Sequence, residues 1–367
     1  SMAIDKAYEA QKEWASWTGK ERAAVLRKWF DLMMENQHDL GVILTAEQGK
    51  PLAEAKGEIA YGASFIEFFG EEAKRVYGEM IPGHQRDKRI MVMKQPIGVA
   101  ASITPWNFPN AMITRKAGPA LAAGCSFVGR PAKETPLSAL VLGVLAERAG
   151  IPKGVFSIVT SSRSSDAGKE FCENPKVRKL TFTGSTEVGR ILLRQAADQV
   201  MKCSMELGGN APFIVFDDAD LDAAVDGAIM CKFRNNGQTC VCANRILVQS
   251  GIHDRFVAAL AARVDGLKVA PGTEDGAMIG PMINTAAITK INAHVEDALS
   301  KGAVRATVTR DLSAQFADPV VLTGATQDMR LAGEETFGPV APIFKFETED
   351  EALAIANGTP FGLAAYF

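Results

Sequence analysis

The chain has 367 residues, 47% of them hydrophobic, and a formal net charge of −3 at pH 7. This length allows a large buried core and favours two domains, whereas the weak, scattered charge argues against a nucleic-acid-binding protein. The longest uninterrupted apolar run, residues 139–146, is far shorter than the ~20 residues of a membrane-spanning helix. No apolar secretory segment opens the chain, so we expect a cytoplasmic protein with no membrane or nucleic-acid partner.

The first hundred residues are predicted to be mainly helical. Residues 18–21 have the spacing of a capping box, and an apolar helical face follows within residues 26–33. A further helix is predicted from residue 52 towards residue 77. Residues 88–95 alternate in polarity, which is typical of an edge strand or a hairpin.

From residue 98 onward, predicted strands alternate with predicted helices. The strands are residues 99–104, 126–128, 155–159, 177–183 and 212–216, and the first helices are residues 111–123 and 136–149, closed by Gly124 and Gly150. Such alternation favours parallel sheets covered on both faces. We therefore predict an α/β fold of two doubly wound parallel-sheet domains, residues 1–207 and 208–367.

Six cysteines are sparse for this length and lack the paired spacing of a zinc site, so we predict reduced thiols and no metal. Four of them lie in or beside apolar segments and are expected to be small core residues: Cys125, Cys172, Cys203 and Cys231. Cys240 differs because Gly237, Gln238 and Thr239 precede it, which indicates a loop rather than a packed helix.

A thiol and a carboxylate on separate glycine-flanked segments suggest covalent chemistry. Cys240 follows Gly237, and Glu206 precedes Gly208 and Gly209. Cysteine is a good nucleophile, and a carboxylate in a dry cleft can serve as a general base. The pair therefore favours a reaction through a thioester.

At this point the sequence resembles the aldehyde dehydrogenases, and among them most closely the succinate-semialdehyde branch. Five motifs occur in the family's order: ITPWNFP at 103–109, FTGSTEVG at 182–189, ELGG at 206–209, GQTC at 237–240 and EETFGP at 334–339. The resemblance implies a Rossmann-like cofactor domain in residues 1–207, an oligomerisation hairpin near residues 80–97 and a catalytic domain in residues 208–367. It also implies a homo-oligomer, a dimer or tetramer, and family segments beyond both ends of this chain.

The glycine turn at Gly184 feeds a predicted helix, and such helix N-termini suit phosphate groups. The spacing is not that of the usual dinucleotide fingerprint, so by itself it favours an ordinary turn between strand and helix. The resemblance instead implies a site for NAD or NADP. The implied cofactor-binding residues are Ile103, Thr104, Trp106, Arg130, Lys133, Thr183, Gly184, Ser185, Glu335 and Phe337.

The choice between NAD and NADP depends on Arg130 and Lys133. By resemblance they occupy the place where family members hold the adenosine ribose, and NAD-specific members commonly have an acidic residue at the position of Lys133. Two cations there favour the 2′-phosphate of NADP. We predict a preference for NADP, with NAD as the alternative. The alternative interpretation of Arg130 and Lys133 is that both are solvated cations on the surface.

By resemblance, Cys240 adds to the aldehyde as a thiolate, and the side-chain amide of Asn107 and the backbone N–H of Cys240 stabilise the oxyanion. Glu206 then activates water to hydrolyse the thioester. Each residue also has an ordinary structural interpretation. Glu206 can be a salt-bridge residue at the end of a strand, and Asn107 can cap the helix that follows Pro109.

The predicted substrate carries a remote carboxylate, because arginines at the positions of Arg115 and Arg234 bind that group in the succinate-semialdehyde branch. The alternative for each arginine is an ion pair with a local Asp or Glu. We predict oxidation of succinate semialdehyde. Glutarate semialdehyde, another aldehyde or a catalytically silent structural member of the family remain alternatives.

Cys242 is a possible redox partner of Cys240, although a bridge from residue i to i+2 demands strained geometry. Its alternative is a second thiol without a role. A cysteine hydrolase is disfavoured, because none of the four histidines lies in a signature linked to Cys240.

Overall fold

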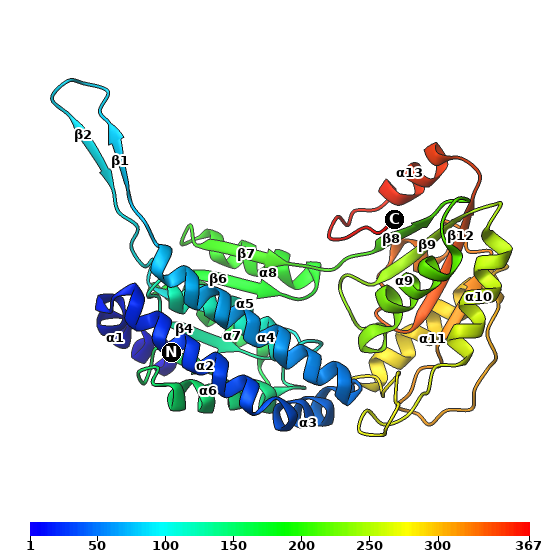
Figure 1. Ribbon diagram of the computed structural model, residues 1–367, viewed down its shortest axis with the longest axis horizontal. Coiled ribbons are helices and arrows are strands. Elements are labelled where there is room, and N and C mark those ends of the chain that lie inside the picture. Colours follow the sequence, from blue (N-terminus) through cyan, green and yellow to red (C-terminus); the bar gives the residue numbers. More distant parts are fainter. The chain divides into compact units, whose positions relative to one another are not determined.

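The computed structural model describes residues 1–367 and separates into two compact units. The first unit comprises Ser1–Glu47 and Ala55–Glu206, and the second comprises Gln48–Glu54 and Leu207–Phe367 (Figure 1). None of the helices combines the length and the apolar character that crossing a bilayer requires.

The first unit contains a sheet and a separate hairpin, with helices packed on the sheet. Its helices are α1 (Met2–Ser16), α2 (Gly19–Glu35), α3 (Gln37–Gln48), α4 (Leu52–Glu72), η1 (Ala73–Arg75), α5 (Ala111–Ala122), α6 (Pro136–Ala149), α7 (Ser164–Glu173) and α8 (Thr186–Ala197). Its strands are β1 (Glu79–Pro82), β2 (Arg89–Val92), β3 (Val99–Ile103), β4 (Phe127–Arg130), β5 (Phe156–Ile158), β6 (Val177–Thr183) and β7 (Lys202–Glu206). The last residue of α3 and the first turn of α4 group with the second unit.

The sheet of the first unit has the strand order β5-β4-β3-β6-β7, and every pairing is parallel. The chain runs outward from β3 to β5 and then returns to the other side of β3 with β6 and β7. The strand order therefore reverses between β3 and β6. Ligands of open parallel sheets bind at the carboxyl ends of the strands beside such a reversal.

Local signals explain where several elements begin and end. Thr18 and Glu21 form the predicted capping box, in which the Glu21 carboxylate accepts from the Thr18 backbone N–H at 2.7 Å. Gly150 ends α6 in the left-handed conformation, at φ 102°. The ring of Trp29 on α2 packs edge-on against Phe156, with ring centroids 5.1 Å apart, which ties this helix to the sheet.

Strands β1 and β2 form a two-stranded antiparallel hairpin in which every residue is exposed. The hairpin extends away from the rest of the first unit (Figure 1, cyan). The alternation at residues 88–95 is thus confirmed as one arm of a hairpin.

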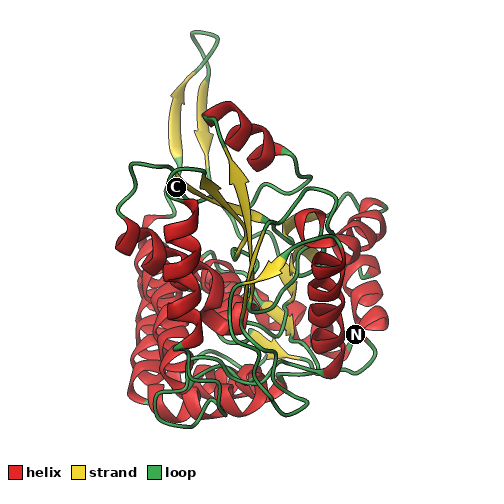
Figure 2. Ribbon diagram, turned by 90° about the vertical axis from the view of Figure 1, so that its right-hand side faces the viewer, coloured by secondary structure: helices red, strands yellow, loops and turns green.

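The second unit contains a five-stranded sheet in the order β10-β11-β12-β9-β8, parallel except for β10. Its strands are β8 (Ala211–Val215), β9 (Ala243–Gln249), β10 (Val304–Arg305), β11 (Val320–Thr323) and β12 (Val340–Phe346). Its helices are α9 (Leu221–Phe233), η2 (Arg234–Gly237), α10 (His253–Asp265), α11 (Thr285–Ser300), α12 (Arg330–Gly333) and α13 (Glu349–Asn357). One apolar cluster joins the sheet to α9 and α10, and another joins it to α11, α12 and α13. Figure 2 shows helices on both sides of these strands, so the predicted α/β class with doubly wound sheets is confirmed.

The segment Gln48–Glu54 packs within the second unit, although its position in the chain places it in the first predicted domain. The Leu52 backbone N–H donates to the Gly272 carbonyl at 2.8 Å. A Cβ on Gly280 would lie 1.9 Å from the Gly49 carbonyl oxygen, so the two backbones touch. Such contacts between distant segments leave no local mark in the sequence.

Candidate active site

The loop between β3 and α5 holds Asn107, which is 3% exposed. Glu58 on α4 anchors the far end of this loop, because its carboxylate accepts from the backbone N–H groups of Asn110 and Ala111 at 2.9 and 3.2 Å. Helix α5 begins at Ala111 with Asn110 at its N-cap, so Asn107 does not cap this helix.

The end of β3 places the other candidates of the first motif. Ile103 is the last residue of β3 and is buried, and the Thr104 backbone N–H donates to the Arg130 carbonyl at 3.1 Å. Trp106 is half-buried in the loop that follows. The ends of β3 and β4 are thereby held side by side.

The turn after β6 begins at Gly184, whose backbone N–H donates to the Glu206 carbonyl at 3.0 Å. A Cβ on Gly184 would lie 2.5 Å from the Phe182 ring, so a larger residue would require this ring to shift. Ser185 is the N-cap of α8 and accepts from the Val188 N–H at 3.3 Å. The turn therefore presents a capped helix N-terminus at the carboxyl end of β6, directly after the buried Thr183.

Arg130 and Lys133 have different surroundings. Arg130 is 6% exposed, and its guanidinium donates to the Ser161 carbonyl at 3.0 Å and to the Ser164 hydroxyl at 2.6 Å. Burial lowers the pKa of Arg130. Lys133 is exposed, with its Nζ 3.9 Å from the Glu134 carboxylate. The solvated-surface interpretation therefore applies to Lys133 and is wrong for Arg130.

Glu206 is the last residue of β7, is exposed and forms no salt bridge. A buried lysine on α5, Lys116, is near enough for the two charges to interact. Burial lowers the pKa of Lys116 to about 8, although the charge of Glu206 opposes the shift, and its Nζ donates to the Thr181 hydroxyl at 3.1 Å. Lys116 was not predicted from the sequence, where its one signal is a cation within the mostly apolar run of α5.

A cavity of about 580 Å³ lies beside these two residues within the first unit. Its polar lining comes from Arg115, Lys116, Lys179, Thr181, Ser204 and Glu206, and aromatic rings complete part of the wall. Because three of these six side chains are cations, the cavity is suited to an anionic group.

Arg115 has aromatic rather than acidic neighbours. Its guanidinium donates to the Tyr61 hydroxyl at 2.6 Å and lies 4.9 Å from the ring centroid of Phe65. No Asp or Glu pairs with it, so the alternative of a local ion pair is wrong for Arg115. Arg234, in the second unit, is exposed at the start of η2.

The loop before Cys240 has an uncommon backbone. Asn235, Asn236 and Gly237 all have left-handed φ angles, of 54°, 58° and 73°. The two asparagines are 0% exposed, whereas Cys240 at the end of the loop is half-buried. Gly209 lies against this loop, because a Cβ there would be 2.5 Å from the Cys240 carbonyl oxygen. The glycine before β8 thus allows the cysteine loop to approach.

Cys242 lies in a different environment from Cys240. It is 0% exposed, and its thiol donates to the carbonyls of Gly237 and Lys232 at 3.4 and 3.6 Å. Burial raises the pKa of Cys242. Lys232 is also fully buried and donates to the Asn244 side chain at 2.8 Å. All six cysteines are free thiols in the structure.

Glu335 lies in the turn before β12. Its carboxylate accepts from the Gly209 N–H at 3.3 Å, and burial raises its pKa to about 7. Lys290 on α11 donates to the Glu335 carbonyl at 2.5 Å. Phe337, two residues later, is half-buried with a left-handed φ of 59°. The turn is therefore held from both its side chain and its backbone.

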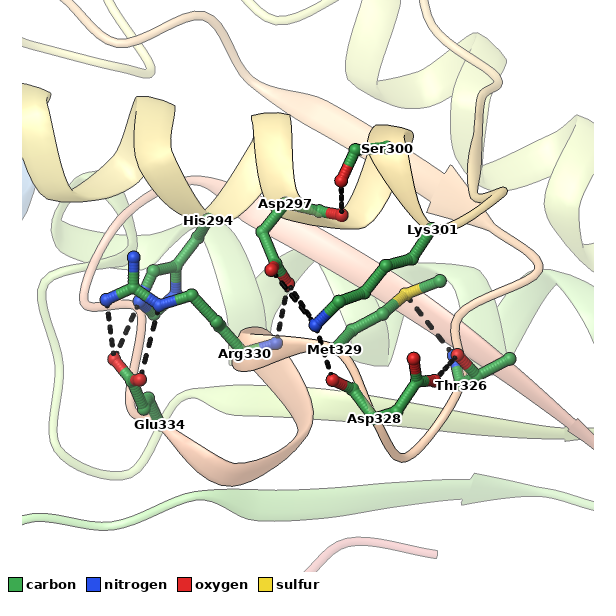
Figure 3. A network of polar contacts seen from close by, with 9 residues as sticks. All are labelled: His294, Asp297, Ser300, Lys301, Thr326, Asp328, Met329, Arg330 and Glu334. Atoms are coloured by element: carbon green, nitrogen blue, oxygen red, sulfur yellow. Dashed lines mark hydrogen bonds and ion pairs between the residues drawn. The ribbon is translucent and has the colours of Figure 1, made fainter.

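His294 on α11 contacts the residues on either side of Glu335, and Figure 3 shows its contact with one of them, Glu334. His294 is fully buried, with its Nε2 3.1 Å from the Glu334 carboxylate and its Nδ1 3.1 Å from the Thr336 hydroxyl. Because a carboxylate only accepts, the proton lies on Nε2 and Nδ1 accepts from Thr336. Burial lowers the pKa of His294, which favours this neutral form. The sequence analysis did not single out this histidine, because no local signal links it to the turn.

Helix α11 also anchors α12. Asp297 accepts from the Arg330 backbone N–H at 2.8 Å and pairs with Lys301 at 3.0 Å, and Arg330 in turn pairs with Glu334 at 3.2 Å. Figure 3 shows these side chains converging between α11 and α12. The candidate turn at Glu335 is therefore supported by a continuous polar network.

Within each unit, the candidates gather at one edge of the sheet. In the first unit, residues 103–107, Arg130, residues 183–185 and Glu206 lie at or after the carboxyl ends of β3, β4, β6 and β7. In the second unit, Cys240 and Glu335 lie before β9 and β12.

Comparison with known proteins places these features in context. Residues 1–367 match the aldehyde dehydrogenase family. A glutarate-semialdehyde dehydrogenase of Pseudomonas aeruginosa is 60% identical over 367 residues, which are 100% of this chain and 76% of the relative. The NADP(+) succinate-semialdehyde dehydrogenase GabD of Escherichia coli is 58% identical over the same shares of each chain. The crystal structure of an aldehyde dehydrogenase from Brucella melitensis biovar abortus superposes with a TM-score of 0.98 at 62% identity, covering 100% of this chain and 76% of that one.

Proposed function

Because this chain belongs to the aldehyde dehydrogenase family, we propose that it oxidises succinate semialdehyde to succinate with NADP. The loop before Cys240 carries the proposal. It is buried and conformationally restrained, and it ends in a half-buried thiol while the neighbouring thiol of Cys242 is enclosed. That arrangement suits a single positioned nucleophile.

In the proposed reaction, the Cys240 thiolate forms a bond to the aldehyde carbon, and the carbonyl oxygen becomes an oxyanion. The side-chain amide of Asn107 and the backbone N–H of Cys240 donate to that oxygen; loss of one such donor typically raises the barrier by about 3 kcal/mol. Bound NADP would supply the acceptor for the hydride that leaves the carbon. The product on Cys240 is a thioester.

Glu206 is the proposed base for the second half of the reaction. Its carboxylate takes a proton from water as the water oxygen attacks the thioester carbon and the Cys240 sulfur leaves. The exposed position of Glu206 gives it access to water. Lys116 is mostly protonated at pH 7, because its pKa is about 8, so a buried cation lies near the Glu206 carboxylate.

The residues of the first unit fit a dinucleotide. The β3/β6 reversal, the closely packed Gly184 and the capped N-terminus of α8 supply the usual setting for a pyrophosphate. Arg130 and Lys133 favour a 2′-phosphate, and Glu335 and Phe337 of the second unit are the proposed contacts of the nicotinamide end. We assign dinucleotide binding to the first domain and the nucleophile to the second.

The substrate class rests on Arg115 and Arg234. The Arg115 guanidinium has no acidic partner and lines a cavity with two lysines, which supports recognition of a carboxylate. Relatives that act on glutarate semialdehyde and succinate semialdehyde are 60% and 58% identical, so overall identity does not choose between them. Glutarate semialdehyde, one methylene longer, is therefore the second candidate.

A panel of aldehydes tests the substrate and the cofactor together. Full-length protein is assayed with succinate semialdehyde, glutarate semialdehyde and uncharged aldehydes, each with NAD and NADP. We expect the highest kcat/KM for succinate semialdehyde with NADP. A higher kcat/KM with NAD contradicts the cofactor assignment, and a preference for uncharged aldehydes contradicts the carboxylate pocket. The absence of turnover on every aldehyde supports a structural role.

We further propose that the protein is a cytoplasmic homo-oligomer. Met80 and Met91 on the β1–β2 hairpin are 70% and 67% exposed, which is typical of a surface that another subunit covers. The six free thiols agree with a reducing compartment. Sedimentation velocity of the protein and of a double variant, Met80→Glu with Met91→Glu, tests the hairpin; an unchanged oligomer contradicts its role.

We also propose that peroxide inactivates the protein through Cys242. Peroxide oxidises the Cys240 thiolate to a sulfenic acid, and the Cys242 thiol then attacks that sulfur with loss of water. Cys242 must first leave its two carbonyl partners. Mass spectrometry of the inactivated protein tests the bridge, and a Cys240 sulfenic acid beside a free Cys242 contradicts it.

A further inference from the structure

The loop that ends at Cys240 has a left-handed backbone conformation over three consecutive residues. Two consecutive asparagines and a glycine have left-handed φ angles of 54°, 58° and 73°. Non-glycine residues adopt this region rarely, and they persist there when surrounding contacts leave no alternative. The structure shows which contacts those are.

Asn236 and Gln238 fasten the loop to a neighbouring segment of the same unit. Asn236 Oδ1 accepts from the Gly280 N–H at 2.7 Å, and its Nδ2 donates to the Pro281 carbonyl at 3.1 Å. Gln238 Oε1 accepts from the Ile283 N–H at 3.2 Å. These bonds use neutral amides that belong to the loop itself.

Glu54 fastens the loop from elsewhere in the chain. Its Oε2 accepts from the backbone N–H of Asn235 at 2.6 Å, across a sequence separation of 181 residues. Asn235 is 0% exposed and is the first of the three left-handed residues. A bond from an N–H to a carboxylate is shorter and stronger than one to a neutral acceptor. The carboxylate therefore holds the point at which the loop enters its strained conformation.

Glu54 is itself held by the second unit. It belongs to the Gln48–Glu54 segment, which bonds to Gly272 through Leu52 and touches Gly280 through Gly49. Burial raises the pKa of Glu54, whereas its bond to Asn235 and the charges of Lys50 and Arg234 lower it. Burying a carboxyl group costs free energy unless the group is hydrogen-bonded, so the bond to Asn235 compensates part of this cost.

We propose that Glu54 is a positioning residue that holds the Asn235–Asn236–Gly237 turn so that the Cys240 thiol and its backbone N–H keep their places. This inference rests on the proposed role of Cys240 as the nucleophile. Without the carboxylate, the turn has one fewer restraint on two consecutive asparagines in the left-handed region, which non-glycine residues adopt rarely. Removal of the Glu54 carboxylate is therefore expected to slow formation of the thioester and to leave cofactor binding unchanged.

The test uses a matched pair in the full-length protein. Glu54→Gln keeps an oxygen acceptor of the same reach, whereas Glu54→Met keeps the length and removes that oxygen. Glu47→Met is the control, because the Glu47 carboxylate also accepts backbone N–H groups, those of Leu137 and Ser138, but in the first unit. Glu54→Ala is the second variant if Glu54→Met does not fold.

Two readouts separate positioning from general stability. The first is deuterium uptake of the peptide that spans residues 234–242, and the second is the rate of the first burst of reduced cofactor. In Glu54→Met we expect uptake about tenfold faster and a burst about 10 to 100 times slower, with the KM for the cofactor within about twofold. Glu54→Gln is expected to restore both readouts to within about threefold, and Glu47→Met to leave both unchanged.

The inference is overturned if Glu54→Met, or Glu54→Ala in its place, keeps wild-type uptake and burst rate, or if Glu54→Gln is as defective as that variant. It is also overturned if Glu47→Met reproduces the defect. Failure of the proposed function has a different signature: Cys240→Ala then retains aldehyde oxidation, whatever Glu54 does. Deuterium uptake reports on the loop in either case.

Discussion

The two units present their candidate residues at opposite ends of parallel strands. In the first unit, Gly184 follows β6 and Glu206 ends β7, so the candidates lie at the carboxyl edge. In the second unit, Cys240 and Glu335 lie in turns that lead into β9 and β12, at the amino edge.

This difference separates two ways of building a site. At the carboxyl edge of the first unit, the loops after β3, β4 and β6 lead into α5, α6 and α8, whose N-terminal N–H groups point toward the strand ends, so local geometry already favours an anion. At the amino edge of the second unit, the loops that hold Cys240 and Glu335 lead into strands rather than into helices. The second unit instead restrains its loops with distant groups, such as Glu54 on Asn235 and Lys290 on Glu335.

The largest expected effect is loss of the nucleophile from the second unit. Cys240→Ala should lower kcat by roughly 10⁴-fold or more, because the remaining groups bind and polarise the aldehyde but form no thioester. Steady-state assay with NADP measures this. Cys172→Ala, a buried thiol of the first unit, is the control and should keep its activity. Undiminished aldehyde oxidation by Cys240→Ala would contradict the proposal that the amino edge of the second unit supplies the nucleophile.

Loss of the base from the first unit should have the next largest effect. Glu206→Gln should still release a first burst of reduced cofactor and then turn over about 10² to 10⁴ times more slowly, because thioester hydrolysis lacks its base. Stopped-flow absorbance separates the burst from the steady state. If the burst disappears along with turnover, Glu206 acts before the thioester forms and the division of roles is wrong.

Each unit contains a buried ionisable side chain that makes the free energy of unfolding depend on pH. The two dependences have opposite signs. In the first unit, burial lowers the pKa of Lys116 to about 8 from an ordinary value near 10.5. Between these values the unfolded chain binds a proton that the folded chain lacks, so the free energy of unfolding rises with pH. Lys116→Met should lose this rise and gain about 3 kcal/mol at pH 7. Urea unfolding of both proteins between pH 7 and 10 measures the free energy of unfolding at each pH, with Lys179→Met as the control.

In the second unit, burial raises the pKa of Glu335 to about 7 from an ordinary value near 4.5. Between these values the folded chain binds a proton that the unfolded chain lacks, so the free energy of unfolding falls as pH rises. Glu335→Gln should lose this fall, which amounts to about 3 kcal/mol by pH 7. The neighbouring Glu334 is a useful control, because its bond to Arg330 lowers its pKa and reverses the slope. Equal slopes for wild type and Glu335→Gln would contradict the prediction.

The smallest expected effect concerns substrate choice in the first unit. Arg115→Leu should lower kcat/KM for succinate semialdehyde by about 10 to 100 times relative to an uncharged aldehyde, because one charge-assisted fork is lost. Arg115→Lys, which keeps the charge without the fork, should fall between the two. If the ratio of kcat/KM for succinate semialdehyde to that for an uncharged aldehyde is unchanged in Arg115→Leu, this arginine only packs against Tyr61 and Phe65 and does not bind the substrate.

Local patterns predicted much of the first unit. The strand at residues 177–183 has the predicted bounds, and the capping box of Thr18 and Glu21 forms as expected. These features depend on residues within a few positions of one another. Each of the five motifs also lies beside a strand, so the motifs indicated that the candidate residues lie at the ends of the strands in both sheets.

Other parts were beyond local prediction. The grouping of Gln48–Glu54 with the second unit, the bond from Asn235 to Glu54 and the support of Glu335 by α11 all join residues tens to hundreds of positions apart. The low pKa of Lys116 likewise depends on how many apolar groups surround it after folding.

The amino-acid sequence by itself determined the α/β class, the alternation of strands and helices and the choice of candidate reactive groups, because side-chain chemistry and short-range periodicity depend on the residues and their order along the chain. Only the tertiary structure decided which backbone turns are restrained, which charges are desolvated and which of two adjacent thiols, Cys240 or Cys242, remains accessible. Strain and desolvation arise when distant segments are packed together, so they are properties of the folded molecule.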